Sequence, residues 1–121
     1  MAATGSGRGV IAFTLVGNDH WPSAAYASLD AIVGAGPVHV VAEGVGPEDG
    51  FAAYRPISGT TRQRWGDYGA AAVVGNDIWI ASEYIGQTCT LAQYIETGFS
   101  CGATRTSLGN WYTHITHLSS M

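Results

Sequence analysis

Short apolar runs separated by turn-forming residues recur along the chain, and this spacing predicts a protein built of β-strands. Residues 10–16 are β-branched and apolar, and the Gly17-Asn18 pair that follows offers the positive φ of a tight hairpin turn. The same pattern recurs where residues 68–74 lead through Gly75-Asn76 into another apolar run. The predicted strands are residues 10–16, 20–29, 37–43, 51–57, 68–74, 77–85 and 110–118. Residues 91–97 favour a helix of one or two turns, so the predicted fold class is all-β.

Successive side chains of a strand point to opposite faces of its sheet. In residues 77–85, Ile78 and Ile80 share one face with Ser82, whereas Trp79 and Ala81 share the other face with Glu83. Because both faces carry apolar groups, we expect this hairpin to be covered on both sides.

One hexapeptide occurs twice, which predicts an internal repeat. Val16-Gly17-Asn18-Asp19-His20-Trp21 recurs as Val74-Gly75-Asn76-Asp77-Ile78-Trp79, and the same offset places Tyr26 on Tyr84. The chain is therefore predicted to be a single domain of two repeats, about residues 9–66 and 67–121. Each repeat would hold about four antiparallel strands, the size of a β-propeller blade. Two blades cannot close a ring, so the chain belongs to a longer protein, or copies assemble, or the strands form a compact β-sandwich.

The composition of the chain limits the kinds of partner that we expect it to bind. Of 121 residues, 46% are apolar and only 12% are charged, with a net charge of −4 and no lysine. An acidic chain with five arginines does not favour a nucleic-acid partner. No run of 18 apolar residues is present, so we expect no membrane span. Residues 1–9 do not form a complete signal peptide.

Two cysteines, Cys89 and Cys101, lie among polar and glycine residues. We favour a disulfide that closes a surface loop in an oxidising compartment over two free thiols in a cytosolic protein. His114 and His117 do not complete a zinc site with them, because residues three apart in a strand face opposite ways.

The segment Arg64-Trp65-Gly66-Asp67-Tyr68-Gly69-Ala70-Ala71 resembles a motif of large bacterial secreted β-propeller proteins of the sialidase-like, BNR-repeat type. Residues 77–84 and Asn110-Trp111 resemble the strands that follow it there, and residues 13–15 and 22–26 resemble the preceding blade. The resemblance covers roughly residues 9–118 and corresponds to the C-terminal end of such proteins. It implies a propeller segment, extracellular or periplasmic, with a link to carbohydrate.

The resemblance does not extend to the catalytic residues of sialidases. No complete Ser-x-Asp-x-Gly-x-x-Trp box is present, and nothing in the sequence places three arginines on one rim. Catalytic residues are thus not transferred to this chain.

The densest group of chemically versatile residues is Arg64, Trp65, Asp67 and Tyr68. Its functional interpretation is a sugar site, with an aromatic platform beside a carboxylate and a guanidinium. We favour a structural interpretation, in which Trp65 packs between blades and Asp67 accepts from turn amides.

Glu83-Tyr84 could serve as the base and nucleophile of a sialidase-like hydrolase, although neighbours in a strand face opposite ways. Glu48 and Asp49 lie in a glycine-rich turn that is a weak candidate for calcium, and a solvated turn is the default. No other cofactor or metal is predicted.

The preferred function is therefore a non-catalytic β-propeller segment of an exported protein, with a structural or binding role and with itself or the rest of a propeller as partner. The first alternative is a carbohydrate-binding module that uses Trp21, Trp65, Trp79 and Trp111. The second is a glycoside hydrolase, completed by other chains, to which Arg64, Asp67, Tyr68 and Glu83 contribute.

Overall fold

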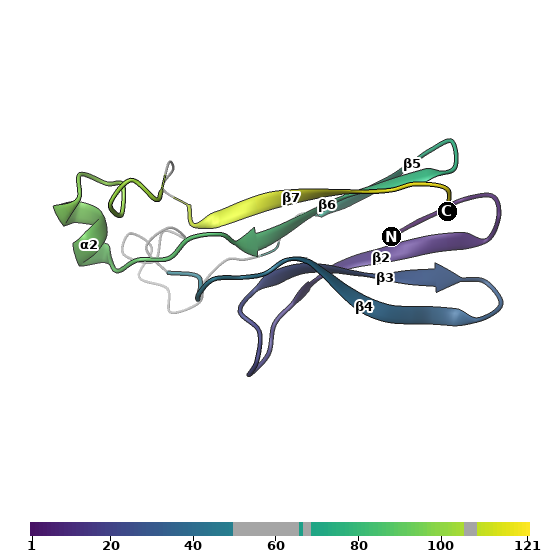
Figure 1. The fold of residues 1–121 in the computed structure, drawn as a ribbon, viewed down its shortest axis with the longest axis horizontal. Coiled ribbons are helices and arrows are strands. Elements are labelled where there is room, and N and C mark those ends of the chain that lie inside the picture. Colours follow the sequence, from purple (N-terminus) through teal and green to yellow (C-terminus); the bar gives the residue numbers. More distant parts are fainter. Residues whose placement is uncertain (50–65, 67–68, 106–108) are drawn as a thin grey trace.

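The computed structural model describes residues 1–49, 66, 69–105 and 109–121, and within them it shows two antiparallel β-sheets (Figure 1). Sheet A has four strands in chain order, namely β1 (Ala2–Ala3), β2 (Arg8–Leu15), β3 (Ser23–Asp30) and β4 (Gly34–Ala42). Sheet B has three, namely β5 (Ala70–Val74), β6 (Asp77–Ile85) and β7 (Trp111–Leu118). One short helix, α2 (Leu91–Glu96), lies between β6 and β7. The all-β prediction is confirmed.

The two sheets lie one above the other as a sandwich (Figure 1). The core between them is formed by Val10 of β2 and by Ile78 and Ile80 of β6, which are 0–3% exposed. Partly buried residues that pack against this core are Ala2, Ala12, Tyr26, Leu118 and Met121. This arrangement agrees with the compact β-sandwich alternative, and the described residues form no closed ring of blades.

The expectation that β6 is covered on both sides is wrong. Ile78, Ile80 and Ser82 face sheet A and are at most 8% exposed, whereas Trp79 on the other face is 43% exposed. Strand β7 shows the same alternation along its whole length. Antiparallel sheets commonly have one packed and one solvated face, so the apolar residues on the outer face of sheet B are exposed.

The two predicted hairpin turns differ. Val74 pairs with Asp77, and Gly75 between them has a φ of 64°, which is the positive value expected for a two-residue turn. β2 and β3 also form an antiparallel hairpin, and the Gly17 N–H donates to His20 O at 3.0 Å across its turn. The positive φ expected at Gly17-Asn18 does not occur there, and the connection runs from residue 16 to residue 22.

The two copies of the hexapeptide also lie at opposite ends of β6. Gly75 precedes the first residue of β6, whereas the last residue, Ile85, donates its N–H to Pro22 O at 3.0 Å. The same sequence therefore occupies two different positions in the fold. The division into two repeats stays a prediction, since the boundary near residues 66–67 adjoins residues that the structure does not describe.

Strand β4 begins earlier than predicted, at Gly34, and includes Pro37. Proline has no N–H to donate to a ladder, but β4 is an edge strand and pairs only with β3. The predicted strand at residues 51–57 lies outside the described residues.

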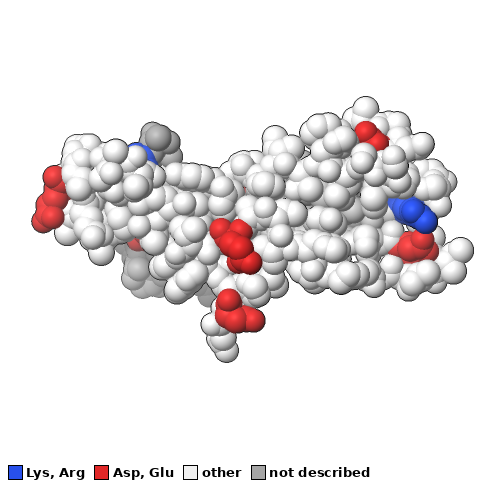
Figure 2. Space-filling model, in the orientation of Figure 1, with Lys and Arg blue, Asp and Glu red and all other residues white. Residues whose placement is uncertain are grey.

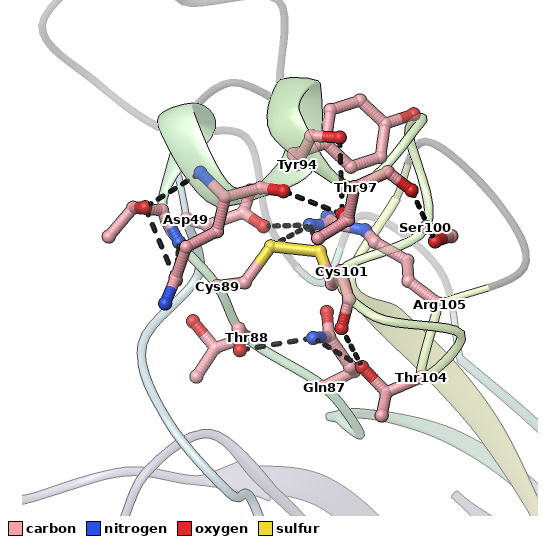
Figure 3. The surroundings of a disulfide bond; sticks show 12 residues. Asp49, Gln87, Thr88, Cys89, Tyr94, Thr97, Ser100, Cys101, Thr104 and Arg105 are labelled. Carbon is pink, nitrogen blue, oxygen red and sulfur yellow. Dashed lines mark hydrogen bonds and ion pairs between the residues drawn. A yellow bond between two sulfur atoms is a disulfide. The ribbon is translucent and has the colours of Figure 1, made fainter.

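The helix and the chain around it form a disulfide-linked cap at one end of the sandwich (Figures 1 and 3). Cys89 and Cys101 form the predicted disulfide. The helix begins with a capping box in which Thr90 Oγ1 accepts from the Gln93 N–H at 3.1 Å. Beneath it, the buried Arg105 guanidinium pairs with Asp49 at 2.6 Å and lies 5.3 Å from the Tyr94 ring centroid.

Candidate functional site

The exposed outer face of sheet B brings three of the predicted candidate residues together. Trp79 and Glu83 stand on this face of β6, and Trp111 stands on it at the start of β7. The face is completed by small or apolar side chains of β5 and by alternate residues of β7. By the strand register, its residues are Ala70, Ala72, Val74, Asp77, Trp79, Ala81, Glu83, Ile85, Trp111, Thr113, Ile115 and His117, of which Ile85 is fully buried.

An aromatic stack stands at one end of this face. Trp79 pairs across the ladder with His117, and their rings are stacked with centroids 4.2 Å apart and an interplanar angle of 14°. His117 Nε2 lies 2.9 Å from Asp77 Oδ2, which fixes the orientation of the imidazole. The Ser120 N–H donates to Asp77 Oδ1 at 3.0 Å. Together with His117, this hydrogen bond holds the pKa of the Asp77 carboxyl below its usual range. The indole of Trp79 is thus held by a polar network and remains 43% exposed.

Trp111 marks the other end of the face and is 38% exposed. Its indole lies against Gly109, where a Cβ would come 3.0 Å from three ring carbons. A side chain at position 109 would therefore push against the ring. The absence of a side chain at Gly109 leaves the space that the Trp111 ring occupies.

A shallow depression lies between these two aromatic residues. It has a volume of about 370 Å³ and is lined by Gly69, Ala70, Ala81, Ser82, Glu83 and Thr113. Alanine and glycine leave its floor low, while Glu83 and Thr113 supply polar atoms at its side. The Glu83 carboxylate has no hydrogen-bond or ion-pair partner among the described residues. It is therefore available to accept hydrogen bonds from a ligand.

Among the described residues, none stands beside Glu83 as the second group of a hydrolase pair. Tyr84 points to the inner face, where its ring contacts those of Tyr112 and His114 edge-on. The other carboxylate on the outer face of sheet B is Asp77, six residues away in the same strand. That separation is about 20 Å, whereas glycosidase carboxylates lie about 5–9.5 Å apart.

The remaining candidates lie elsewhere. Trp21 is 53% exposed in the connection between β2 and β3, away from the outer face of sheet B. Arg64, Trp65, Asp67 and Tyr68 lie outside the described residues. Gly66 and Gly69, which flank Asp67 and Tyr68 in the sequence, line a second depression of about 250 Å³ that Glu83 also lines.

The candidate calcium turn is occupied by a protein contact, because Asp49 pairs with the buried Arg105. His114 and His117 face opposite ways in β7, as expected from their spacing. Within the described ranges, no group of three or more His, Cys, Asp or Glu side chains could hold a metal ion.

Charged side chains are few and scattered over the surface (Figure 2). Neither of the two described arginines belongs to a strand of sheet B. Arg8 lies on sheet A with its Nε 4.0 Å from Asp30, and Arg105 is buried in the disulfide-linked cap. The described charges on the face itself are the carboxylates of Glu83 and Asp77, and the His117 imidazole lies beside Asp77.

The sequence analysis missed Thr113, Ile115 and the role of His117 as the partner of Trp79. Their alternation along β7 can be read from the sequence. The sequence does not reveal the register that places His117 opposite Trp79. A short turn would fix that register, but β6 and β7 are joined through α2.

Fold and site together define a two-sheet β-sandwich with an aromatic-flanked depression on one exposed sheet face. No protein-family model, curated protein or solved structure matches this chain. No helix among the described residues is long and apolar enough to cross a membrane.

Proposed function

We propose that this chain is a non-catalytic module of an exported protein and that it binds carbohydrate on the outer face of sheet B. The observation that supports the proposal is the exposure of Trp79 and Trp111 on one face, on either side of a depression whose carboxylate, Glu83, has no partner in the described part of the chain. The disulfide between Cys89 and Cys101 supports export, since such bonds persist in oxidising compartments.

The side chains on this face match the chemistry of a sugar ring. A pyranose has an apolar C–H face that packs on an indole and a rim of hydroxyls that donate and accept hydrogen bonds. Tryptophan offers a large rigid contact area of this kind at low entropic cost. Glu83 accepts hydrogen bonds from ring hydroxyls, and the Thr113 hydroxyl both donates and accepts. Binding sites in general combine an apolar lining with a few well-placed polar groups.

Titration of the protein with a glycan panel, followed by tryptophan fluorescence and calorimetry, tests the proposal. We expect W79A to weaken binding at least tenfold, because it removes the stacking surface held by His117. W111A is expected to weaken binding of longer glycans. The matched control is W21A, which removes a tryptophan that is 53% exposed, against 43% for Trp79, and lies outside the outer face of sheet B. A lack of binding across the panel, or equal losses in W21A and W79A, would refute the proposal.

A propeller segment is the second candidate function, and the outer face of sheet A favours it. Alternate residues of β2, β3 and β4 present an apolar surface there, namely Ile11, Phe13, Leu15, Leu29, Val38 and Val40. Ile11 and Val38 are 40% and 52% exposed, so the surface resembles a blade that lacks its neighbour. This candidate retains the sialidase-like origin as a proposal.

Light scattering behind a sizing column separates the two candidates. Trimers or tetramers would support copies that close a ring of blades. A monomer that retains glycan binding would favour the independent module and contradict self-assembly.

A further inference from the structure

We infer that the ligand is an uncharged oligosaccharide that lies along β6 and β7, and not a sialylated or uronate-containing glycan. This inference rests on the proposed function and specifies its ligand class. Two independent observations support it, the charge of the face and the separation of its aromatic residues.

The charge of the outer face of sheet B disfavours an anionic ligand. Glu83 lines the depression, and no described side chain compensates its negative charge. A ligand carboxylate placed here would meet a like charge in a partly desolvated site, which is unfavourable. The described arginines are bound elsewhere, Arg8 to Asp30 and Arg105 to Asp49.

His117 does not change this conclusion. Its Nε2 is already held by Asp77 at 2.9 Å, and its ring face is covered by Trp79. The imidazole therefore supports the indole and is not a free cationic anchor. Sialic acid recognition needs cations that the described part of this face does not provide.

The length of the face indicates more than one sugar unit. Trp79 is six residues from Ile85, the β6 partner of Trp111, so the backbone positions of the two tryptophans are about 20 Å apart along the strand direction. A single pyranose spans only a fraction of this distance. An extended chain of several units contacts both indoles and passes over Ala81 and the depression between them.

Calorimetric titration with matched probes tests the inference. The probes are neutral hexose tetrasaccharides of several linkages, the corresponding monosaccharides, and tetrasaccharides in which hexuronates replace the hexoses. At low salt, we expect the best neutral tetrasaccharide to bind at least tenfold more tightly than its uronate counterpart and its monosaccharide. In E83Q, the uronate penalty should shrink severalfold, because the repulsive charge is removed while the amide still accepts a hydrogen bond. E43Q, which removes an exposed carboxylate directly after β4, should leave the ratio unchanged.

The possible failures are distinguishable. If no probe of any kind binds, the proposed carbohydrate function fails. If uronates bind as tightly as neutral chains, or E83Q and E43Q behave alike, the charge argument is overturned while carbohydrate binding stands. If the monosaccharide binds as tightly as the tetrasaccharide, or W111A leaves the preference for length intact, the extended binding mode is overturned.

Discussion

Truncation of Ile78 is the most direct test of how the two sheets are held together. Its side chain is fully buried and belongs to the cluster that includes Val10 from the opposite sheet. I78A removes three buried carbons, which contribute about 2.4 kcal/mol at about 0.8 kcal/mol each. The cavity left between two β-layers adds to this loss, so we expect a total of about 3–4 kcal/mol. That is a large part of the ~5–15 kcal/mol by which domains are stable.

Urea unfolding followed by circular dichroism measures this loss, and I115A is its matched control. Ile115 is also in sheet B but is 63% exposed on the outer face, so I115A should change the free energy of unfolding by less than about 0.5 kcal/mol. Similar stabilities of I78A and I115A would refute the reasoning, because they would show that the inner face of sheet B is not packed against sheet A.

Two further predictions concern the disulfide and one carboxylate. Replacing Cys89 and Cys101 together with serine should lower the free energy of unfolding by about 3 kcal/mol, the loop-closure value for a link of this length, and two free thiols in air-oxidised protein would contradict the bond. The pKa of Asp77 is lowered by the Ser120 N–H and by His117, so its stabilising effect is present above the usual Asp pKa and is lost as pH falls through the lower native value. D77N should therefore flatten the acid limb of stability measured from pH 6 to pH 2, and an unchanged limb would contradict this assignment.

Local patterns predicted most of the strands. Residues 77–85 were predicted with both ends correct because Gly75-Asn76 marks a turn on one side and Gly86 follows on the other. The short helix was predicted within one residue of its observed end, Glu96. These features depend on neighbours in the sequence, so local propensity and turn chemistry determine them.

Long-range features could not be predicted in the same way. The repeated hexapeptide predicted two equivalent hairpins, yet Gly17 lies in a long connection whose end contacts β6 through Pro22. Which apolar face of β6 is buried depends on the position of sheet A, and no local pattern contains that information. The prediction that β6 is covered on both sides was wrong for this reason. In the structure, the face of β6 that carries Trp79 is exposed.

The candidate site finally depends on the register between β6 and β7. Gly86 N–H donates to Asn110 O at one end of the pair, and Met121 N–H donates to Asn76 O at the other. Shifting β7 by one residue would turn every β7 side chain to the other face, so that His117 and Trp111 would point toward sheet A. The core opposes that shift, because it would take Leu118 away from Val10, Ile78 and Ile80 and bring His117 inward. Burial of Ile78 and exposure of Trp79 are therefore two consequences of the same register, and the stability of the sandwich also determines the geometry of the site.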